Sequence, residues 1–195
     1  MLRVLLALLL LLSLSAVQAQ ALYRPVGDAG LGLSAATTLN DGEAADVAGA
    51  LIVTASPALD LAVSVGRATL GRREATTLGA AATYWVQRTS PSRAGLQAGL
   101  SRLEADGRSA VVINVGTVVG RQLDLSRQSL LVPSLSANVI YVASDDFGSG
   151  LQTSVSAEAA LVLDLGGARA HVGPSVTLNS ETSRLGIGIG GGILF

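Results

Sequence analysis

Most side chains that could do chemistry together lie in one short part of the sequence. They are titratable, hydroxyl or guanidinium groups: Glu158, Asp164, Arg169, His171, Ser175 and Arg184. His171 is the only histidine of the chain, and a histidine in hydrogen-bond contact with a serine is a common way to activate a hydroxyl nucleophile. Whether His171 can serve Ser175 in this way depends on the secondary structure that holds them.

The residues around this pair alternate between apolar and polar. Ala170, Val172, Pro174, Val176 and Leu178 share one face, and Arg169, His171, Gly173, Ser175 and Thr177 share the other. A period of two predicts a β-strand. His171 and Ser175 then stand roughly 13 Å apart along the strand, whereas nucleophile activation needs a contact of about 3 Å. We therefore expect no enzyme activity and keep a lipid-modifying outer-membrane enzyme only as an alternative.

The Gly166-Gly167 dipeptide predicts how two such strands pair. A two-residue hairpin loop at this point places Arg169 opposite Asp164 and Ser175 opposite Glu158. If Asn179 pairs with Arg184 in the next hairpin, His171 faces Gly192, and the glycines of the last strand leave room for larger polar groups. The six residues first named then form one inward polar cluster, which either satisfies itself within a packed interior or constricts a lumen.

The same alternation runs through most of the chain. Ten segments show it: 28–38, 47–55, 59–69, 76–88, 93–103, 109–121, 129–143, 151–165, 168–178 and 184–195. No segment has a helical period. The connector 122–128 is longer than a turn should be, so eight strands remain an alternative to ten. Pro133 and Pro174 fall inside two segments, where bulges would have to absorb them.

The first residues are expected to serve export. Arg3 is followed by an apolar run from Val4 to Leu14 and by small residues up to Ala19, which is the layout of a secretory signal peptide. The run is shorter than the roughly 20 apolar residues that a transmembrane helix needs. The predicted organisation is a signal peptide at 1–19, an N-terminal periplasmic segment at 20–27 and one barrel domain at 28–195.

An apolar face on nearly every strand favours a membrane barrel over a secreted soluble β-sandwich, whose edge strands would be marked by charge or proline. Five outward residues cover about nine positions, or roughly 30 Å of strand. At a tilt of ~40° this gives a height of about 23 Å, close to the ~25 Å apolar band of such barrels. The connectors also alternate between short turns and longer polar loops. We predict an all-β, antiparallel, up-and-down transmembrane barrel.

The end of the chain resembles bacterial outer-membrane β-barrel proteins. Apolar residues occupy alternate positions before a terminal phenylalanine: Leu185, Ile187, Ile189, Ile193 and Phe195. The resemblance implies that these residues are an assembly signal for the barrel-assembly machinery and that the protein resides in the bacterial outer membrane, in contact with its lipid. Such barrels usually carry aromatic girdles, but the mature chain offers only Tyr23, Tyr84, Trp85, Tyr141, Phe147 and Phe195.

The composition excludes several other classes of protein. The chain has no cysteine and a formal net charge of −1, and no basic cluster suggests nucleic acid as a partner. Asp145 and Asp146 offer too few ligands for a dedicated calcium site, so neither a metal nor a cofactor is expected.

The expected function is that of a structural or surface-exposed membrane protein, with a narrow channel as one option and a passive pore for small solutes as an alternative. The oligomeric state stays open.

Overall fold

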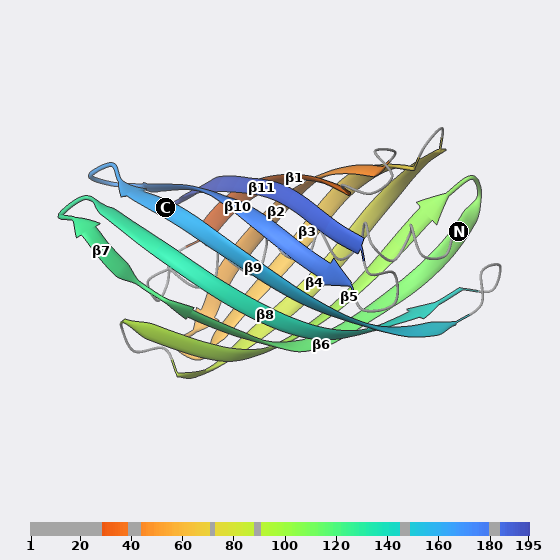
Figure 1. Ribbon diagram of the computed structural model, residues 1–195, viewed down its shortest axis with the longest axis horizontal. Coiled ribbons are helices and arrows are strands. Elements are labelled where there is room, and N and C mark those ends of the chain that lie inside the picture. The colour runs from red at the N-terminus through yellow and green to blue at the C-terminus, as the bar shows by residue number, and fades with distance from the viewer. Residues whose placement is uncertain (1–28, 39–43, 71–72, 88–90, 145–148, 180–183) are drawn as a thin grey trace.

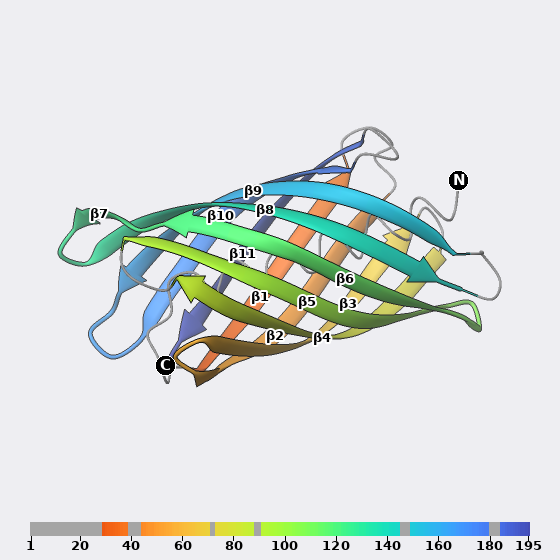
Figure 2. The same ribbon diagram turned by 90° about the horizontal axis from the view of Figure 1, so that it is seen from below.

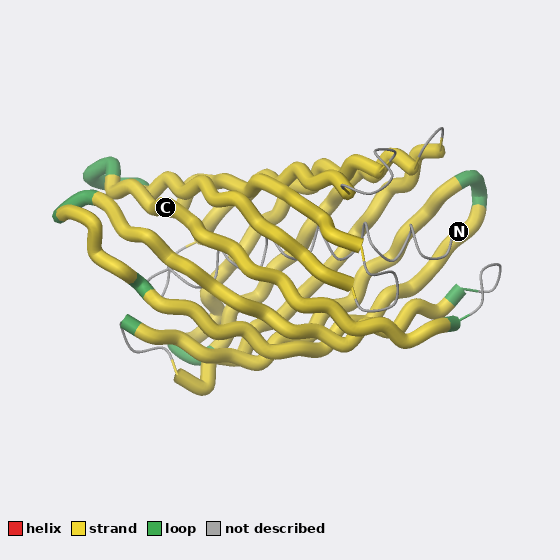
Figure 3. Tube along the Cα trace, viewed as in Figure 1, coloured by secondary structure: helices red, strands yellow, loops and turns green. Residues whose placement is uncertain are grey.

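The computed structural model describes residues 29–38, 44–70, 73–87, 91–144, 149–179 and 184–195. The predicted signal peptide and N-terminal segment lie outside these residues. The strands are β1 (Ala29–Thr38), β2 (Ala44–Ser56), β3 (Leu59–Leu70), β4 (Arg73–Gln87), β5 (Ser92–Ala105), β6 (Arg108–Arg121), β7 (Leu123–Ser126), β8 (Ser129–Ala143), β9 (Gly150–Asp164), β10 (Arg169–Asn179) and β11 (Arg184–Leu194). Figure 3 shows that strands make up nearly all of the described chain. No helix in the described part is long and apolar enough to cross a membrane.

The strands form one closed antiparallel barrel. Each strand pairs with its neighbour in the order β6-β5-β4-β3-β2-β1-β11-β10-β9-β8, and β6 pairs with β8 to complete the ring. The first and last strands join through two backbone hydrogen bonds of 3.0 Å between Ala29 and Phe195. Figures 1 and 2 show steeply inclined strands that wrap around a common axis. The all-β, up-and-down barrel predicted from the alternation is confirmed.

The segment 122–128, which the sequence left ambiguous, contains the end of a strand and a turn. β6 and β7 both pair with β8 in one register, since Gly120 faces Ser134 and Leu123 faces Leu131. They are one strand interrupted at Gln122, so the ring contains ten strands. In this register the pairing of β6 with β8 stops at Gly120, one residue before the position opposite Pro133, and proline has no N–H to donate to the ladder. β7 and the start of β8 extend beyond their neighbours (Figures 1 and 2).

Two expectations about local structure were wrong. The bulges predicted at Pro133 and Pro174 are absent. The register of β8 with β9 runs unshifted through Pro133, and the register of β9 with β10 is the same on both sides of Pro174, although pairing is not made at Gly173 and Pro174 themselves. The expected contrast in loop length is also smaller than predicted. Strands β3 and β4 are separated only by residues 71–72, and β5 and β6 only by 106–107.

The outer surface of the barrel is apolar. Large aliphatic side chains on alternate positions are exposed on every strand of the ring; examples are Leu33 on β1, Val65 on β3, Val115 on β6 and Ile189 on β11. A soluble protein would not expose so large a continuous apolar surface to water. A closed barrel satisfies its backbone hydrogen bonds internally, which is the condition for a sheet to lie in a bilayer. This surface therefore faces lipid, and the opposite side chains fill the lumen.

The barrel lumen as candidate functional site

The middle of the lumen is lined by neutral polar side chains that bond to one another. Gln97 on β5 donates from Nε2 to Oδ1 of Asn138 on β8, at 2.6 Å. Between them on β6 lies Gly116, which pairs with both residues. A Cβ at position 116 would collide with Asn138 Oδ1 and the carbonyl oxygen of Ala137. The glycine thus provides the space through which the amide pair reaches across a strand.

A second group of polar contacts joins β9 and β10. The hydroxyls of Ser156 and Thr177 lie 2.9 Å apart, and Asn179 donates from Nδ2 to Oε1 of Gln152 at 3.0 Å. All four side chains are buried. Because buried polar groups are costly unless they are hydrogen-bonded, these pairs hold the two strands in register as well as filling space.

An apolar cluster fills the lumen towards the end of the barrel at which Ala29 and Phe195 lie. Its buried members come from five different strands: Trp85, Val118, Val132, Ala160, Val162 and Leu194. β4, which carries Trp85, and β9, which carries Val162, are four positions apart in the ten-strand ring. The cluster therefore spans the lumen from one wall towards the other. We call these six residues the lumen plug.

Trp85 joins the plug to a buried carboxylate. Its indole Nε1 donates to Oδ2 of Asp60 on β3, at 2.6 Å, and both side chains are almost completely buried. A Cβ at Gly95, its partner on β5, would stand 3.1 Å from Trp85 Cε3. The expectation that Trp85 is available for a lipid-facing girdle was wrong, because its indole fills the interior of the barrel. The inward side chains of β4 lie at odd-numbered positions. This alternation was the signal that could have identified Trp85 as an inward residue.

The predicted pairings of the polar cluster are those of the structure. Arg169 pairs with Asp164 and Ser175 with Glu158, and His171 pairs with Gly192. Glu158 also pairs with Ser134 on β8, so a serine stands on each side of it. Arg184 pairs with Asn179 through the backbone, but its side chain lies outside the described part.

These residues do not converge on one point. Arg169 Nε is 3.7 Å from Asp164 Oδ2, and both side chains are about one-third to one-half exposed. This pair lies at the mouth of the barrel, where Asp164 also accepts a hydrogen bond from the Gly166 amide at 2.9 Å. It is a long, partly solvated ion pair at the rim, and pairs of this kind contribute little to stability.

His171 is buried, and its cross-strand partners are Val162 and Gly192. A Cβ at position 192 would stand only 2.6 Å from His171 Cε1, so the imidazole occupies the space that the glycine leaves. Among the described residues no three acidic, histidine or cysteine side chains form a group that could hold a metal ion.

No protein-family model and no curated protein matches the sequence. Among solved structures, the β-domain of the Bordetella autotransporter BrkA has a TM-score of 0.52 at 11% identity, covering 87% of this chain and 98% of its own. A bacterial polysaccharide outer membrane secretin has a TM-score of 0.51 at 9% identity, covering 88% and 76%. The translocator domain of the autotransporter NalP from Neisseria meningitidis has a TM-score of 0.49 at 10% identity, covering 93% and 94%.

At these identities the likeness is one of fold alone. The fold shared with BrkA and the secretin is that of outer-membrane barrels, and this chain adds a closed ring of strands with an apolar exterior. The chain has the fold of an integral membrane β-barrel, with an exterior suited to contact with lipid.

Proposed function

We propose that this protein is a sealed outer-membrane barrel that acts as a structural or surface-exposed element and not as a solute pore. The lumen plug is the observation that supports this role. A pore for hydrated solutes would leave the side chains that line it in contact with water. Here the plug residues are at most 3% exposed, and mid-lumen groups such as Asn138 and Gln152 are also buried. Barrels of this size have lumens that side chains can fill.

Conductance in planar lipid bilayers tests this role. The folded wild-type barrel is expected to give no stable conductance steps. The double variant Trp85→Ala/Val162→Ala removes two plug side chains from opposite parts of the wall and is expected to admit ions. A slower-migrating band after boiling would confirm, on a gel, that each protein was folded before the measurement. Regular conductance steps from the wild type would instead favour a narrow channel.

The assembly signal is part of the same proposal. Ile187, Ile189, Ile193 and Phe195 are exposed on the outer face of the barrel at its last strand, and Leu185 is half-buried there. An exposed row of alternating apolar side chains is a surface that another protein can read. We infer that the barrel-assembly machinery recognises this row before the strand is closed against β1.

The proposal includes the absence of catalysis. The paired positions of His171 hold a valine and a glycine, and Ser175 lies four residues along the same strand. Four strand residues separate these two side chains by roughly 13 Å, which is beyond the contact of about 3 Å that nucleophile activation needs.

A further inference from the structure

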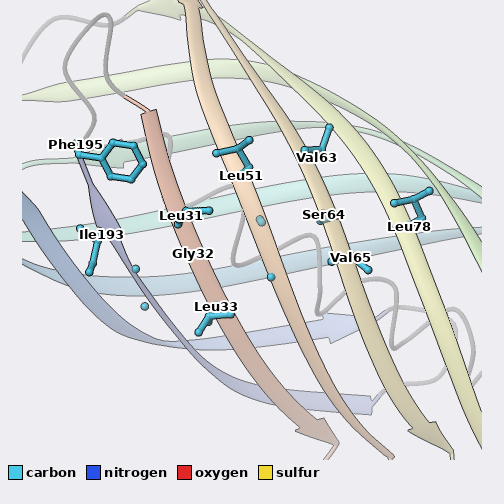
Figure 4. Close-up of a pocket in the computed structure, with 14 residues that line it drawn as sticks. Leu31, Gly32, Leu33, Leu51, Val63, Ser64, Val65, Leu78, Ile193 and Phe195 are labelled. Carbon is cyan, nitrogen blue, oxygen red and sulfur yellow. The ribbon is translucent and has the colours of Figure 1, made fainter.

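The outer surface of the barrel contains a groove that no role described so far uses. It crosses β11, β1, β2, β3 and β4 and has a volume of about 1040 Å³. This is at the upper end of the range of pockets that take small ligands, roughly 300–1,000 Å³. Figure 4 shows its side chains spread along the wall, with Phe195 and Ile193 at one end and Leu78 at the other.

The groove is hollow because two outward positions carry no side chain. One row of cross-strand partners runs from Gly191 to Leu33, then to Gly49, Val65 and Leu78. Leu33 thus stands between two glycines, while its neighbours in the row below are full-sized: Ile193, Leu31, Leu51 and Val63. The wall is recessed on both sides of Leu33.

The far end of this row reaches charged residues. Leu78 pairs with Arg102 on β5, and Arg67 follows Val65 two positions later on β3. Arg67 bonds to Glu74 at 2.8 Å and Arg102 to Glu104 at 2.7 Å. All four side chains are 60–72% exposed. They lie towards the end of the barrel opposite to Ala29 and Phe195, where the next connectors are 71–72 and 106–107.

We propose that this groove binds an acylated membrane lipid with a phosphate-bearing head group. The acyl part lies in the recess along Leu33 and Gly49, and the phosphate lies at Arg67 and Arg102. The groove offers almost only apolar surface, which suits hydrocarbon. Beyond its Leu78 end stand Arg102, the cross-strand partner of Leu78, and Arg67, and their planar guanidinium forks bind phosphate oxygens well.

The ion pairs of Arg67 and Arg102 with their glutamates are compatible with a bound phosphate. Exposed pairs of this kind contribute little to stability, so each arginine can exchange a carboxylate partner for a phosphate at small cost. Each guanidinium also has five N–H donors, of which a single carboxylate contact uses only part. The inference does not depend on whether the lumen conducts, so the two proposals can fail separately.

The test uses the full-length folded barrel in a mild detergent. It is titrated with a bis-phosphorylated, multiply acylated glycolipid and, in parallel, with phosphatidylcholine, and native mass spectrometry counts the bound lipids. We expect one tightly held phosphorylated lipid per barrel and weaker, unsaturated uptake of phosphatidylcholine. Arg67→Ala/Arg102→Ala should weaken the binding of the phosphorylated lipid about tenfold or more, because two sets of charge-assisted hydrogen bonds are lost.

Two matched pairs of variants separate the head group from the acyl groove. Glu74→Gln/Glu104→Gln removes the competing carboxylates and should leave the affinity equal or higher. Gly49→Leu should also weaken binding about tenfold. A Cβ at this position makes only ordinary contacts, with Leu33 Cδ2 at 3.6 Å and the Gly32 carbonyl oxygen at 3.9 Å, so the added side chain fits and projects into the recess. Val115→Leu, on the outer face of β6 and away from both the groove and the two arginines, should bind as the wild type does.

The proposal is overturned by equal affinity for the two lipids, or by full binding in either the double arginine variant or the Gly49→Leu variant. A lipid-free dimer that Gly49→Leu dissociates would also overturn it, because the groove would then belong to a second copy of the chain. A gel shift on boiling verifies that every variant is folded.

Discussion

Small and large residues alternate across the strands inside this barrel. Gly116 lies beneath the Gln97–Asn138 bond, and Gly192 leaves room for His171. The second of these pairs could be predicted from the glycines of the last strand, because their spacing and the Gly166-Gly167 turn together fix the register. The first could not be predicted, because the ambiguous connector 122–128 left the register of β6 with β8 open.

Replacement of Gly116 by alanine tests the amide bridge. The added Cβ would collide with Asn138 and with the backbone of Ala137, so the Gln97–Asn138 bond must break or the strands must shift. Overpacking of this kind costs about 1–3 kcal/mol. Urea unfolding of the folded barrel, followed by tryptophan fluorescence, should show this loss. Gly150→Ala is the control, because a Cβ at position 150 meets nothing within 4 Å, and equal stability of the two variants would refute the bridge.

Asp164 gives a second prediction at this scale. Asp164→Ala should lower the free energy of unfolding by only about 1 kcal/mol, because its ion pair with Arg169 is long and partly exposed. Most of the loss should come from the turn bond to Gly166. Asp164→Asn keeps an oxygen that can accept this bond and should restore most of the stability. If the asparagine variant is as unstable as the alanine variant, the ion pair matters more than the turn.

At the scale of elements, the alternation predicted the ten strands because every outward residue meets lipid and every inward one meets the lumen. The break at Gln122 was not predicted, since it depends on the register of β6 with β8, which the connector 122–128 left open. The apolar character of much of the interior was also missed. Leu103, Val112 and Ile140 are inward and buried, yet in the sequence they look like any strand residue, because their partners come from other strands.

The proposed assembly signal at the last strand can be tested through its terminal residue, Phe195. Phe195→Ala keeps the two backbone hydrogen bonds with Ala29 and removes a ring that is 60% exposed. Stability of the refolded barrel in detergent should therefore change little. In cells, the amount of heat-modifiable protein in the outer membrane should fall severalfold, because the assembly row has lost its terminal side chain. A variant that accumulates normally would show that Phe195 is not part of the signal.

At the scale of the whole molecule, the barrel reverses the usual placement of apolar groups. Its exterior is the larger apolar surface, and its interior combines a polar middle with the lumen plug. The chain has no cysteine and so no disulfide to stabilise it. Closure of the strand ring and the packing inside it take that role, and a packed interior of this kind is the reason for proposing that the barrel is sealed.

The most direct test of the sealed lumen is the reactivity of a single cysteine placed inside it. Ser154 is 3% exposed, on the inward face of β9, and Ser154→Cys changes one atom type in a chain with no other thiol. The exposed Ser109, at the rim of β6, supplies the matched Ser109→Cys control. Both folded proteins are treated with a water-soluble, membrane-impermeant maleimide. The account predicts rapid labelling at position 109 and labelling at position 154 only after the barrel is unfolded, whereas equally rapid labelling of the folded protein at both positions would contradict a sealed lumen.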